Sequence, residues 1–395
     1  NCSMKGSEIA HAARNFKDKV VARHSIAPTG WAPRPHRPRT PGRWCPVILT
    51  VTLNAAVDLT YRLDRVRRHG SNRVTDVAER AGGKGVNVAR VLAVLGHPAV
   101  VTGLAGGATG RTLRADLAAA GLPDELVPIA GTSRRTVTVV EDRAGDATVY
   151  LEPGPVVSPA EWSRFVTRYR RLLGGAAAVV LSGSLPAGLP EDAYGTLAAL
   201  AAAAGVPAVL DADGPALRAG LAAGPALVKP NADELAAAVG DTGPLAGARA
   251  LRASGARAVV ASLGPDGLLA STPDGEWRAR PPEHVRGNPT GAGDSAVAAL
   301  TAGLVAGTPW PERLADAVAL SAATVLAPLA GGFDPAGLRR LRPLVRVEPL
   351  GAERADARHV TPHRAAPKHA AAPGPAAPHG AGPRPADPQG EPCPS

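Results

Sequence analysis

Apolar residues follow two alternating patterns along the middle of the chain. Short runs such as Ala178–Leu181 are apolar at every position, and the longer segments between them are rich in alanine and leucine. Strands that are apolar on both faces are typical of a parallel sheet covered by helices on each side. The alternation of such strands with helices predicts an α/β fold, a doubly wound sheet in three α/β/α layers.

Most of the predicted elements lie between residues 47 and 262. The predicted strands are 47–53, 99–104, 178–182, 207–211, 226–229 and 257–262. The predicted helices are 85–95, 109–120, 159–173, 190–204, 213–222, 231–239 and 244–254. Residues 60–80 and 135–151 have the pattern of amphipathic strands outside this alternation. We therefore expect a small β-lid beside the main sheet.

The two ends of the chain differ from the middle in composition and charge. Residues 1–45 carry nine Lys or Arg and two acidic residues, within a chain of formal net charge +10. The other end is rich in Pro, Ala, Gly and His, and neither end has the apolar periodicity needed to bury a core. We predict a folded domain over 47–345, a disordered basic extension over 1–46 and a disordered Pro/Ala-rich tail over 346–395.

The basic extension has two interpretations. Met4 is the only methionine and the ordered pattern starts abruptly at Val47, so translation that starts near Val47 is one hypothesis. A basic arm that binds an acidic partner is the other. Because the excess positive charge is mainly confined to this end, it is weak evidence for nucleic-acid binding, and we expect no nucleic-acid partner.

No run in the sequence is apolar enough for a membrane span, and the N-terminus lacks the apolar segment of a secretion signal. The three cysteines, Cys2, Cys45 and Cys393, indicate neither a disulfide framework nor a zinc site. We therefore expect a cytoplasmic protein without a membrane partner.

Residues 288–295, Asn-Pro-Thr-Gly-Ala-Gly-Asp-Ser, form a glycine-flanked turn that opens an alanine-rich helix. Free backbone N–H groups of Gly291, Ala292 and Gly293 would bind an anion at the positive end of that helix. Asp294 would repel a phosphate that was merely held there. The carboxylate is useful if it accepts a proton from a hydroxyl while the amides stabilise a phosphoryl group in transfer, which indicates a kinase.

The same turn formally fits the dinucleotide-binding pattern G-x-G-x-x-A over residues 291–296. We discount this alternative because the turn lies late in the chain and no predicted strand runs directly into it. Asp294 would also face the pyrophosphate.

Four further loops follow predicted strands, where ligands bind in an open α/β sheet. Asp58, in the first of them, could accept hydrogen bonds from sugar hydroxyls or simply form a turn or helix cap. In the second, Ala-Gly-Gly-Lys-Gly-Val-Asn, Gly83 lets the backbone approach a ligand, Lys84 offers a charge to an anion and Asn87 offers an amide. This loop is not a P-loop, because Gly85 stands where Ser or Thr would hold Mg²⁺.

The two later loops each have a structural and a functional interpretation. Asn231 and Glu234 have the spacing of a helix capping pair, or they organise Mg²⁺ through water around a nucleoside triphosphate. Residues 262–267 form a hairpin turn, or they wrap their backbone around the nucleotide. Local chemistry leaves both choices open.

Taken together, these motifs resemble the PfkB (ribokinase-like) family of carbohydrate kinases over about residues 47–342. The segments Gly-Gly-Lys-Gly-Val-Asn-Val-Ala and Gly-Ala-Gly-Asp-Ser are similar to the two signatures of the family, with Leu-Ser-Gly-Ser-Leu-Pro and Val-Lys-Pro-Asn-Ala-Asp-Glu between them in order. The resemblance implies a ribokinase-like fold and a phosphotransferase that uses ATP and Mg²⁺.

Two segments, Thr52–Asp58 and Thr132–Thr136, are similar to the branch of the family that contains 1-phosphofructokinases and tagatose-6-phosphate kinases. This implies a ketohexose phosphate substrate, with fructose 1-phosphate converted to fructose 1,6-bisphosphate. Tagatose 6-phosphate and fructose 6-phosphate are the alternative substrates. A catalytically silent regulator that binds a sugar phosphate is the alternative from a different class.

The resemblance also implies a role for each candidate residue. Asp294 would be the base, assisted by the amides of residues 291–293, and Glu234 would be linked to Mg²⁺ through water. The residues that hold the sugar phosphate would be Asp58, Gly83, Lys84, Asn87 and Arg134. Lys84 and Arg134 would pair with its phosphate, with Arg135 in place of Arg134 if the register shifts by one. The ATP side would be lined by Lys229, Asn231, Ser262, Gly264 and Gly267. Exposed lid strands imply a homodimer through the lid.

Overall fold

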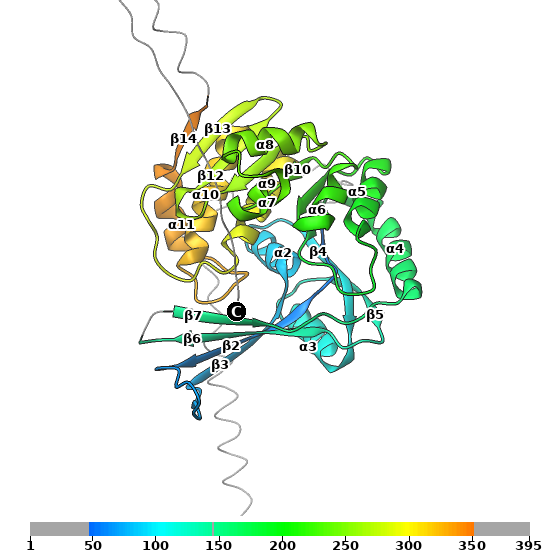
Figure 1. Cartoon of the computed structure of the whole chain (residues 1–395), viewed down its shortest axis with the longest axis vertical. Helices are drawn as coiled ribbons and strands as arrows, with labels where there is room; N and C mark the ends of the chain where they lie inside the picture. The colour runs from blue at the N-terminus through cyan, green and yellow to red at the C-terminus, as the bar shows by residue number, and fades with distance from the viewer. Residues whose placement is uncertain (1–46, 144–145, 351–395) are drawn as a thin grey trace, which may run out of the picture. The chain divides into compact units, whose positions relative to one another are not determined.

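The computed structural model describes residues 47–143 and 146–350; the predicted basic extension and the tail beyond residue 350 lie outside these ranges. A ten-stranded sheet forms the centre of the described fold (Figure 1). In spatial order its strands are β14 (Arg346–Pro349), β13 (Gly275–Arg280), β12 (Leu268–Thr272), β11 (Val259–Ser262), β10 (Leu227–Val228), β9 (Ala208–Asp211), β8 (Ala176–Ser182), β1 (Val47–Thr52), β4 (Ala99–Gly106) and β5 (Asp124–Ile129).

The strands from β11 to β5 pair in parallel, which confirms the predicted doubly wound α/β sheet. Strands β12, β13 and β14 extend it with antiparallel pairs that the alternation did not predict. Strand β14 carries the fold to Pro349, past the domain end predicted at residue 345. Its four residues are too few to show a periodicity of their own, and they form a strand because the edge of β13 is available for pairing.

Helices cover both faces of the sheet. One core contains residues of α2 (Lys84–Val94), α3 (Gly107–Ala119), α9 (Ala292–Ala306) and α10 (Trp310–Val325). The other contains residues of α4 (Pro159–Leu173), α5 (Ala193–Ala203), α6 (Gly214–Leu221), α7 (Ala232–Val239) and α8 (Pro244–Ala253). A short helix, α11 (Pro335–Leu341), follows α10. Within the described ranges no helix is long and apolar enough to cross a membrane.

Strand β8 shows why the central strands are apolar at every position. Val179 and Leu181 pack into one core, and Val180 between them packs into the other. All three side chains are fully buried. Successive residues of a strand point to opposite faces, so a strand covered by helices on both sides needs apolar residues throughout.

A separate four-stranded sheet forms the predicted lid. Its strands lie in the order β3 (Asp76–Gly82), β2 (Ala56–Leu63), β6 (Arg134–Glu141) and β7 (Asp146–Leu151), and β2 begins earlier than the predicted start near residue 60. On β3, Ala78 and Arg80 are partly buried, whereas Val77 and Glu79 are exposed. This alternation gives the lid an inner face and an outer face.

One set of polar contacts fixes the base of the lid. Asp116 on α3 accepts a hydrogen bond from the backbone N–H of Ala81 at 2.8 Å and another from the guanidinium of Arg90 on α2. Arg90 is buried, and a buried guanidinium needs an acceptor of this kind. Because Ala81 stands directly before the glycine loop that opens α2, these contacts set where the lid strand passes into the helix.

Helix α4 has the bounds predicted for it, 159–173, and its start explains the agreement. Ser158 and Glu161 form a capping box, with Pro159 in the first turn. The helix predicted from residue 190 begins instead at Ala193, because the Ala193 N–H donates to the Pro190 carbonyl in a turn at 3.0 Å.

We expect Phe165→Ala to lower the free energy of unfolding by about 3–5 kcal/mol, measured by chemical denaturation. Phe165 is fully buried on α4 and stacks against both Trp162 and Tyr169. Arg170→Ala on the exposed side of the same helix is the control, with an expected change within about 0.5 kcal/mol. A similar small change for both variants would contradict the packing described.

Candidate active site

The turn at residues 288–291 opens helix α9. Gly291 caps the helix with φ 85°, a left-handed conformation that favours glycine. The Ala292 N–H donates to the Pro289 carbonyl at 3.1 Å, so the prediction of three free amides is wrong for Ala292: the tight turn uses that donor itself. Within the described residues the amides of Gly291 and Gly293 donate to no acceptor, and both can bind an anion at the helix start.

Asp294 is buried in the first turn of α9, with 7% of its surface exposed. Asn87 on α2 donates from Nδ2 to Asp294 Oδ2 at 2.8 Å. Burial, reinforced by the negative charge of Asp211, raises the pKa of Asp294 to about 6, against the lowering effect of Asn87 and of two lysines. Asp294 is therefore ionised at neutral pH and still basic enough to accept a proton.

Two lysines and two carboxylates gather beside the start of α9. Lys229 Nζ lies 3.2 Å from Asp211 Oδ1, and Lys84 Nζ lies 3.6 Å from the same oxygen. Lys84 Nζ also lies 3.8 Å from Glu234 Oε1. A Cβ atom at Gly293 would lie 3.6 Å from Lys229 Nζ, which places this positive charge next to the free amides.

Asp211 is a site residue that the sequence analysis missed. Burial would raise its pKa, but the charges of Lys229 and Lys84 outweigh burial and lower it. Ser182, at the end of the neighbouring strand β8, donates its hydroxyl to Asp211 Oδ2 at 3.3 Å. Asp211 is a carboxylate at the carboxyl end of a short apolar strand, and the same pattern pointed to Asp58. This pattern could therefore have identified Asp211 as well.

Asn231 and Glu234 form the capping pair that their spacing predicted. Asn231 Oδ1 accepts from the Glu234 N–H, and Glu234 Oε2 accepts from the Asn231 N–H, both at 2.8 Å. Ser262 pairs with Asn231 in a parallel β-bridge. The residues from Gly264 to Gly267 make the turn between β11 and β12. The capping and hairpin interpretations are both confirmed, and Glu234 Oε1 still faces the cluster.

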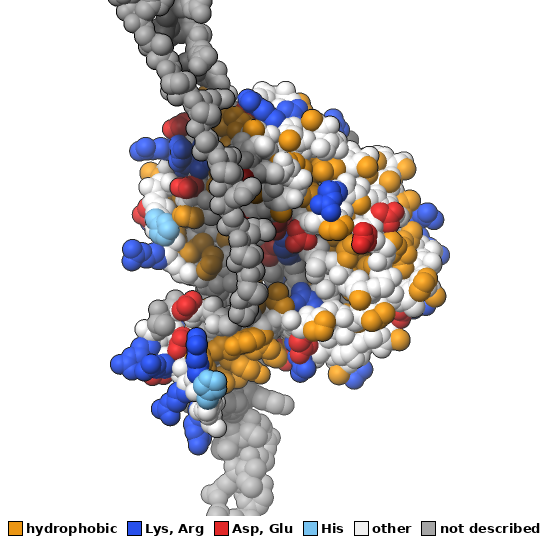
Figure 2. All heavy atoms as spheres, in the orientation of Figure 1, with side chains coloured by type: hydrophobic (Ala, Val, Ile, Leu, Met, Phe, Trp, Pro, Cys, Tyr) orange, Lys and Arg blue, Asp and Glu red, His pale blue; other side chains and the backbone are white. Residues whose placement is uncertain are grey.

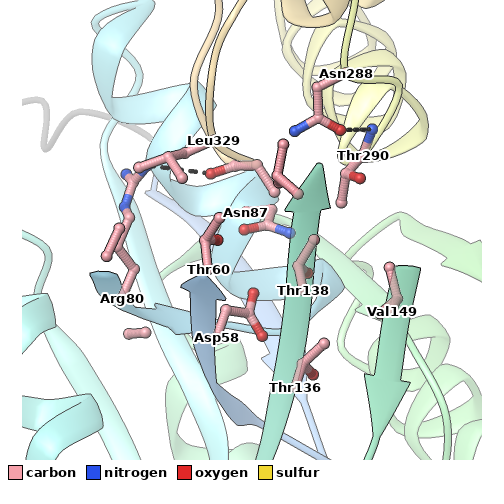
Figure 3. Close-up of a pocket in the computed structure, with 14 residues that line it drawn as sticks. Asp58, Thr60, Arg80, Asn87, Thr136, Thr138, Val149, Asn288, Thr290 and Leu329 are labelled. Atoms are coloured by element: carbon pink, nitrogen blue, oxygen red, sulfur yellow. Dashed lines mark hydrogen bonds between the residues drawn. The ribbon is translucent and has the colours of Figure 1, made fainter. Parts of the chain in front are cut away.

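A pocket of about 600 Å³, part of it open solvent, lies between the lid strands, helix α2, the turn before α9 and residues 329–330 (Figure 3). Asp58 reaches it from β2, and Asn87 reaches it from α2. Asn288 and Thr290 line it from the turn before α9. The pocket therefore brings two of the predicted sugar-binding residues, Asp58 and Asn87, together with the turn before the helix of Asp294. The other three, Gly83, Lys84 and Arg134, are not among its lining residues.

Asp58 lies against the glycine loop, where a Cβ atom at Gly82 would overlap its carboxylate. Burial raises the pKa of Asp58 to about 6, although a hydrogen bond from Thr136 and the charges of Arg134 and Arg80 lower it. Asp58 is thus a partly buried acceptor flanked by two guanidinium groups.

The two candidate arginines, Arg134 and Arg135, have different partners and different exposure. Arg134 is partly buried and donates to the Asn54 carbonyl at 3.2 Å and to the Thr136 hydroxyl at 3.3 Å. Arg135 instead pairs with Glu152 at 3.0 Å, with more than half of its side chain exposed. The geometry favours Arg134 for the site.

Lys84 and Arg134 lie in different halves of the site. The contacts of Lys84 are with Asp211 and Glu234, whereas Arg134 lies near Asp58, and the two share no partner among the described residues. Gly83 is the N-cap of α2 with φ 105°, between the two halves.

A family model described as "pfkB family carbohydrate kinase" matches residues 51–336. This range contains the lid, the glycine loop that opens α2, the capping pair and the turn that opens α9. It therefore covers every candidate site residue.

Three relatives illustrate the similarity. A 1-phosphofructokinase from Xanthomonas campestris pv. campestris is 40% identical over 266 residues, which are 65% of this chain and 84% of that protein. The structure of phosphofructokinase-2 from Escherichia coli in complex with fructose-6-phosphate is 31% identical, with a TM-score of 0.69, over 75% of this chain and 98% of that one. The structure of a possible 1-phosphofructokinase from Thermotoga maritima is 25% identical, with a TM-score of 0.71, over 77% and 99%.

We expect Asp294→Asn to be more stable than the parent protein at pH 8. The folded-state pKa of Asp294, about 6, lies above the ordinary value of 3.8. The folded protein therefore loses stability as the pH rises from about 4 to about 6, and this loss remains at higher pH. A difference of this size corresponds to about 3 kcal/mol at most. Urea unfolding should show a gain of about 1–3 kcal/mol at pH 8 and almost none at pH 4.

Asp241→Asn, at an exposed position, is the matched control and should show no such pH-dependent gain. A variant at position 294 that is less stable than the parent at pH 8 would contradict the assigned cost of burying this carboxylate.

Proposed function

The chain belongs to the PfkB family of carbohydrate kinases, and we propose that it transfers the terminal phosphoryl group of ATP to a ketohexose phosphate. The proposed substrate is fructose 1-phosphate, and the product is fructose 1,6-bisphosphate. Membership of this family shows that the chain is a carbohydrate phosphotransferase. The pocket and the relatives support the proposal for which sugar it phosphorylates.

One observation carries the proposal: Asn87 belongs to both halves of the site. Its side chain lines the pocket together with Asp58 and also donates to Asp294. A sugar held by Asp58 and Asn87 can therefore present a hydroxyl to Asp294. Such positioning is the main requirement for in-line phosphoryl transfer.

In the proposed reaction Asp294 accepts the proton of the attacking hydroxyl. The sugar oxygen forms a bond to the γ-phosphorus as the bond from that phosphorus to the β-phosphate oxygen breaks, and ADP leaves. The amides of Gly291 and Gly293, with the ammonium of Lys229, lie where they can stabilise the charge on the moving phosphoryl group. The lid would exclude water, because hydrolysis of ATP competes with transfer.

Mg²⁺ would be held by few protein ligands. No group of three or more His, Cys, Asp or Glu side chains in the described ranges could hold a metal ion. Mg²⁺ commonly binds through one or two carboxylates, several waters and the phosphates of the substrate. Glu234 fits this pattern, because its cap uses Oε2 and leaves Oε1 facing the cluster. The bound ion would neutralise charge between the phosphates of ATP.

The nucleotide would lie on the side of Lys229, Asn231 and Ser262. The bridge between Asn231 and Ser262 brings the turn at Gly264 and Gly267 next to the start of α7. This arrangement offers backbone groups to a nucleotide beside the two lysines.

A phosphate already present on the sugar needs a cation in the pocket half of the site. Arg134 supplies one beside Asp58, and its guanidinium can donate to two phosphate oxygens at once. The 40% identity with a 1-phosphofructokinase favours fructose 1-phosphate, and the E. coli structure with fructose-6-phosphate keeps that sugar as the second candidate.

We also propose that two copies pair through the lid. Strand β7 is an edge of the lid sheet, and Tyr150 and Leu151 on it are 60% and 69% exposed. Figure 2 shows hydrophobic side chains gathered on the lid, at the place where Figure 1 labels β2 and β3. An exposed edge with large apolar side chains favours association with another chain.

ATP consumption in the presence of fructose 1-phosphate, fructose 6-phosphate, tagatose 6-phosphate, fructose and ribose tests the substrate. We expect the highest kcat/KM with fructose 1-phosphate. In Asp294→Asn, kcat should fall by roughly 10² or more while KM for both substrates stays within a few-fold, because only the proton acceptor is removed.

A higher kcat/KM with another sugar would overturn the proposed substrate, and near-normal turnover by Asp294→Asn would overturn the proposed base. Binding of a sugar phosphate without ATP consumption would instead favour a regulator.

We expect Arg134→Ala to raise the KM for the sugar phosphate by about tenfold or more, with a smaller change in kcat, because it removes a positive charge beside Asp58. Arg135→Ala is the matched control on the adjacent residue and should leave KM within about twofold, since Arg135 pairs with Glu152 on the exposed side. Equal effects of the two substitutions would move the phosphate contact elsewhere.

A further inference from the structure

Arg80 stands in the wall of the pocket, and no carboxylate of residues 47–143 or 146–350 forms an ion pair with it. It lies on lid strand β3, directly opposite Asp58 in the register of the β2–β3 pair. Of the fourteen residues that line the pocket, Arg80 alone carries a positive charge (Figure 3). Its Nη1 donates to the Ala330 carbonyl at 3.2 Å, and it forms no ion pair with any described residue.

Three other arginines of the lid and of helices α2 and α3 each have a carboxylate partner. Arg90 is bonded to Asp116, Arg114 to Asp124 and Arg135 to Glu152. Arg80 has one bond to a neutral carbonyl, and most of the five N–H donors of its guanidinium remain for another acceptor.

The surroundings of Arg80 make its charge costly without an anion. Burial and the nearby charge of Arg90 lower its pKa, and the charges of Asp116 and Asp58 only partly oppose them. A partly buried cation that forms no ion pair within the described ranges carries a desolvation cost that a bound anion would offset. Asp58 is itself shared with Arg134, and its oxygens are the proposed acceptors for sugar hydroxyls.

We propose that Arg80 binds the phosphate that the sugar substrate already carries, on the opposite side of Asp58 from Arg134. This inference rests on the proposed function. The lid order β3-β2-β6 places the two arginines on strands that flank the strand of Asp58. A phosphate in this pocket would therefore be held by a guanidinium that no sequence motif indicated, and Arg80 would help to select phosphorylated over free sugars.

The contact with Ala330 gives the same residue a connection to the catalytic turn. A Cβ atom at Gly291 would lie 3.3 Å from Ala330, so the loop that accepts from Arg80 packs on the turn that opens α9. A merely structural Arg80 would tie the lid to this loop and would affect all sugars alike. A phosphate-binding Arg80 affects phosphorylated sugars selectively.

Equilibrium binding in the absence of ATP separates these roles. Calorimetry on the full chain would compare fructose 1-phosphate, fructose 6-phosphate and, by displacement, free fructose for the parent, Arg80→Ala, Arg80→Lys and Arg135→Ala. We expect Arg80→Ala to weaken the tighter sugar phosphate by about tenfold or more and free fructose by less than about twofold. Arg80→Lys should recover part of the loss, because lysine keeps the charge without the fork of donors. Arg135→Ala should change neither ligand.

Equal weakening of phosphorylated and free sugars by Arg80→Ala would overturn the proposal, and so would no weakening. If the parent prefers free fructose, the proposed substrate class and the role of Arg80 both fail. If the parent prefers a sugar phosphate and Arg80→Ala keeps that preference, only the role of Arg80 fails.

Discussion

The burial of one carboxylate, Asp294, is the constraint on which the site depends. An ionised side chain in the first turn of a buried helix is tolerable only where donors and positive charge surround it. Asn87 supplies a direct hydrogen bond, and Lys84 and Lys229 supply charge. The starts of α2 and α9 must therefore meet at the same place, and the lid sheet and the strand ends are arranged around that meeting point.

Much of this arrangement could be predicted because its signals are local. Central strands such as β8 are buried on both faces, so their composition alone identifies them. The glycine turn before Asp294 and the capping pair Asn231–Glu234 also lie within a few residues of the element that they begin. The choice between Arg134 and Arg135 stayed open, because the alternation of a strand decides it only when the register is known.

What the sequence did not predict depends on contacts between distant segments. Strand β14 forms because an edge is available, and the Ala292 N–H is used by a turn whose closure no motif describes. Arg80 enters the pocket because β3 pairs with β2 in one particular register. Asp211 becomes a site residue when two lysines from separate loops converge on it. Register and convergence are properties of the folded chain.

The two carboxylate oxygens of Glu234 have different roles, and this has a consequence for the entropy of binding. One oxygen is fixed by the backbone of Asn231 as α7 forms, so the direction of the other oxygen is set when the protein folds. A long glutamate side chain free in solvent would lose rotamer freedom each time a ligand ordered it. Here that freedom is lost once, during folding, and the start of a helix leaves the cluster preorganised for successive turnovers.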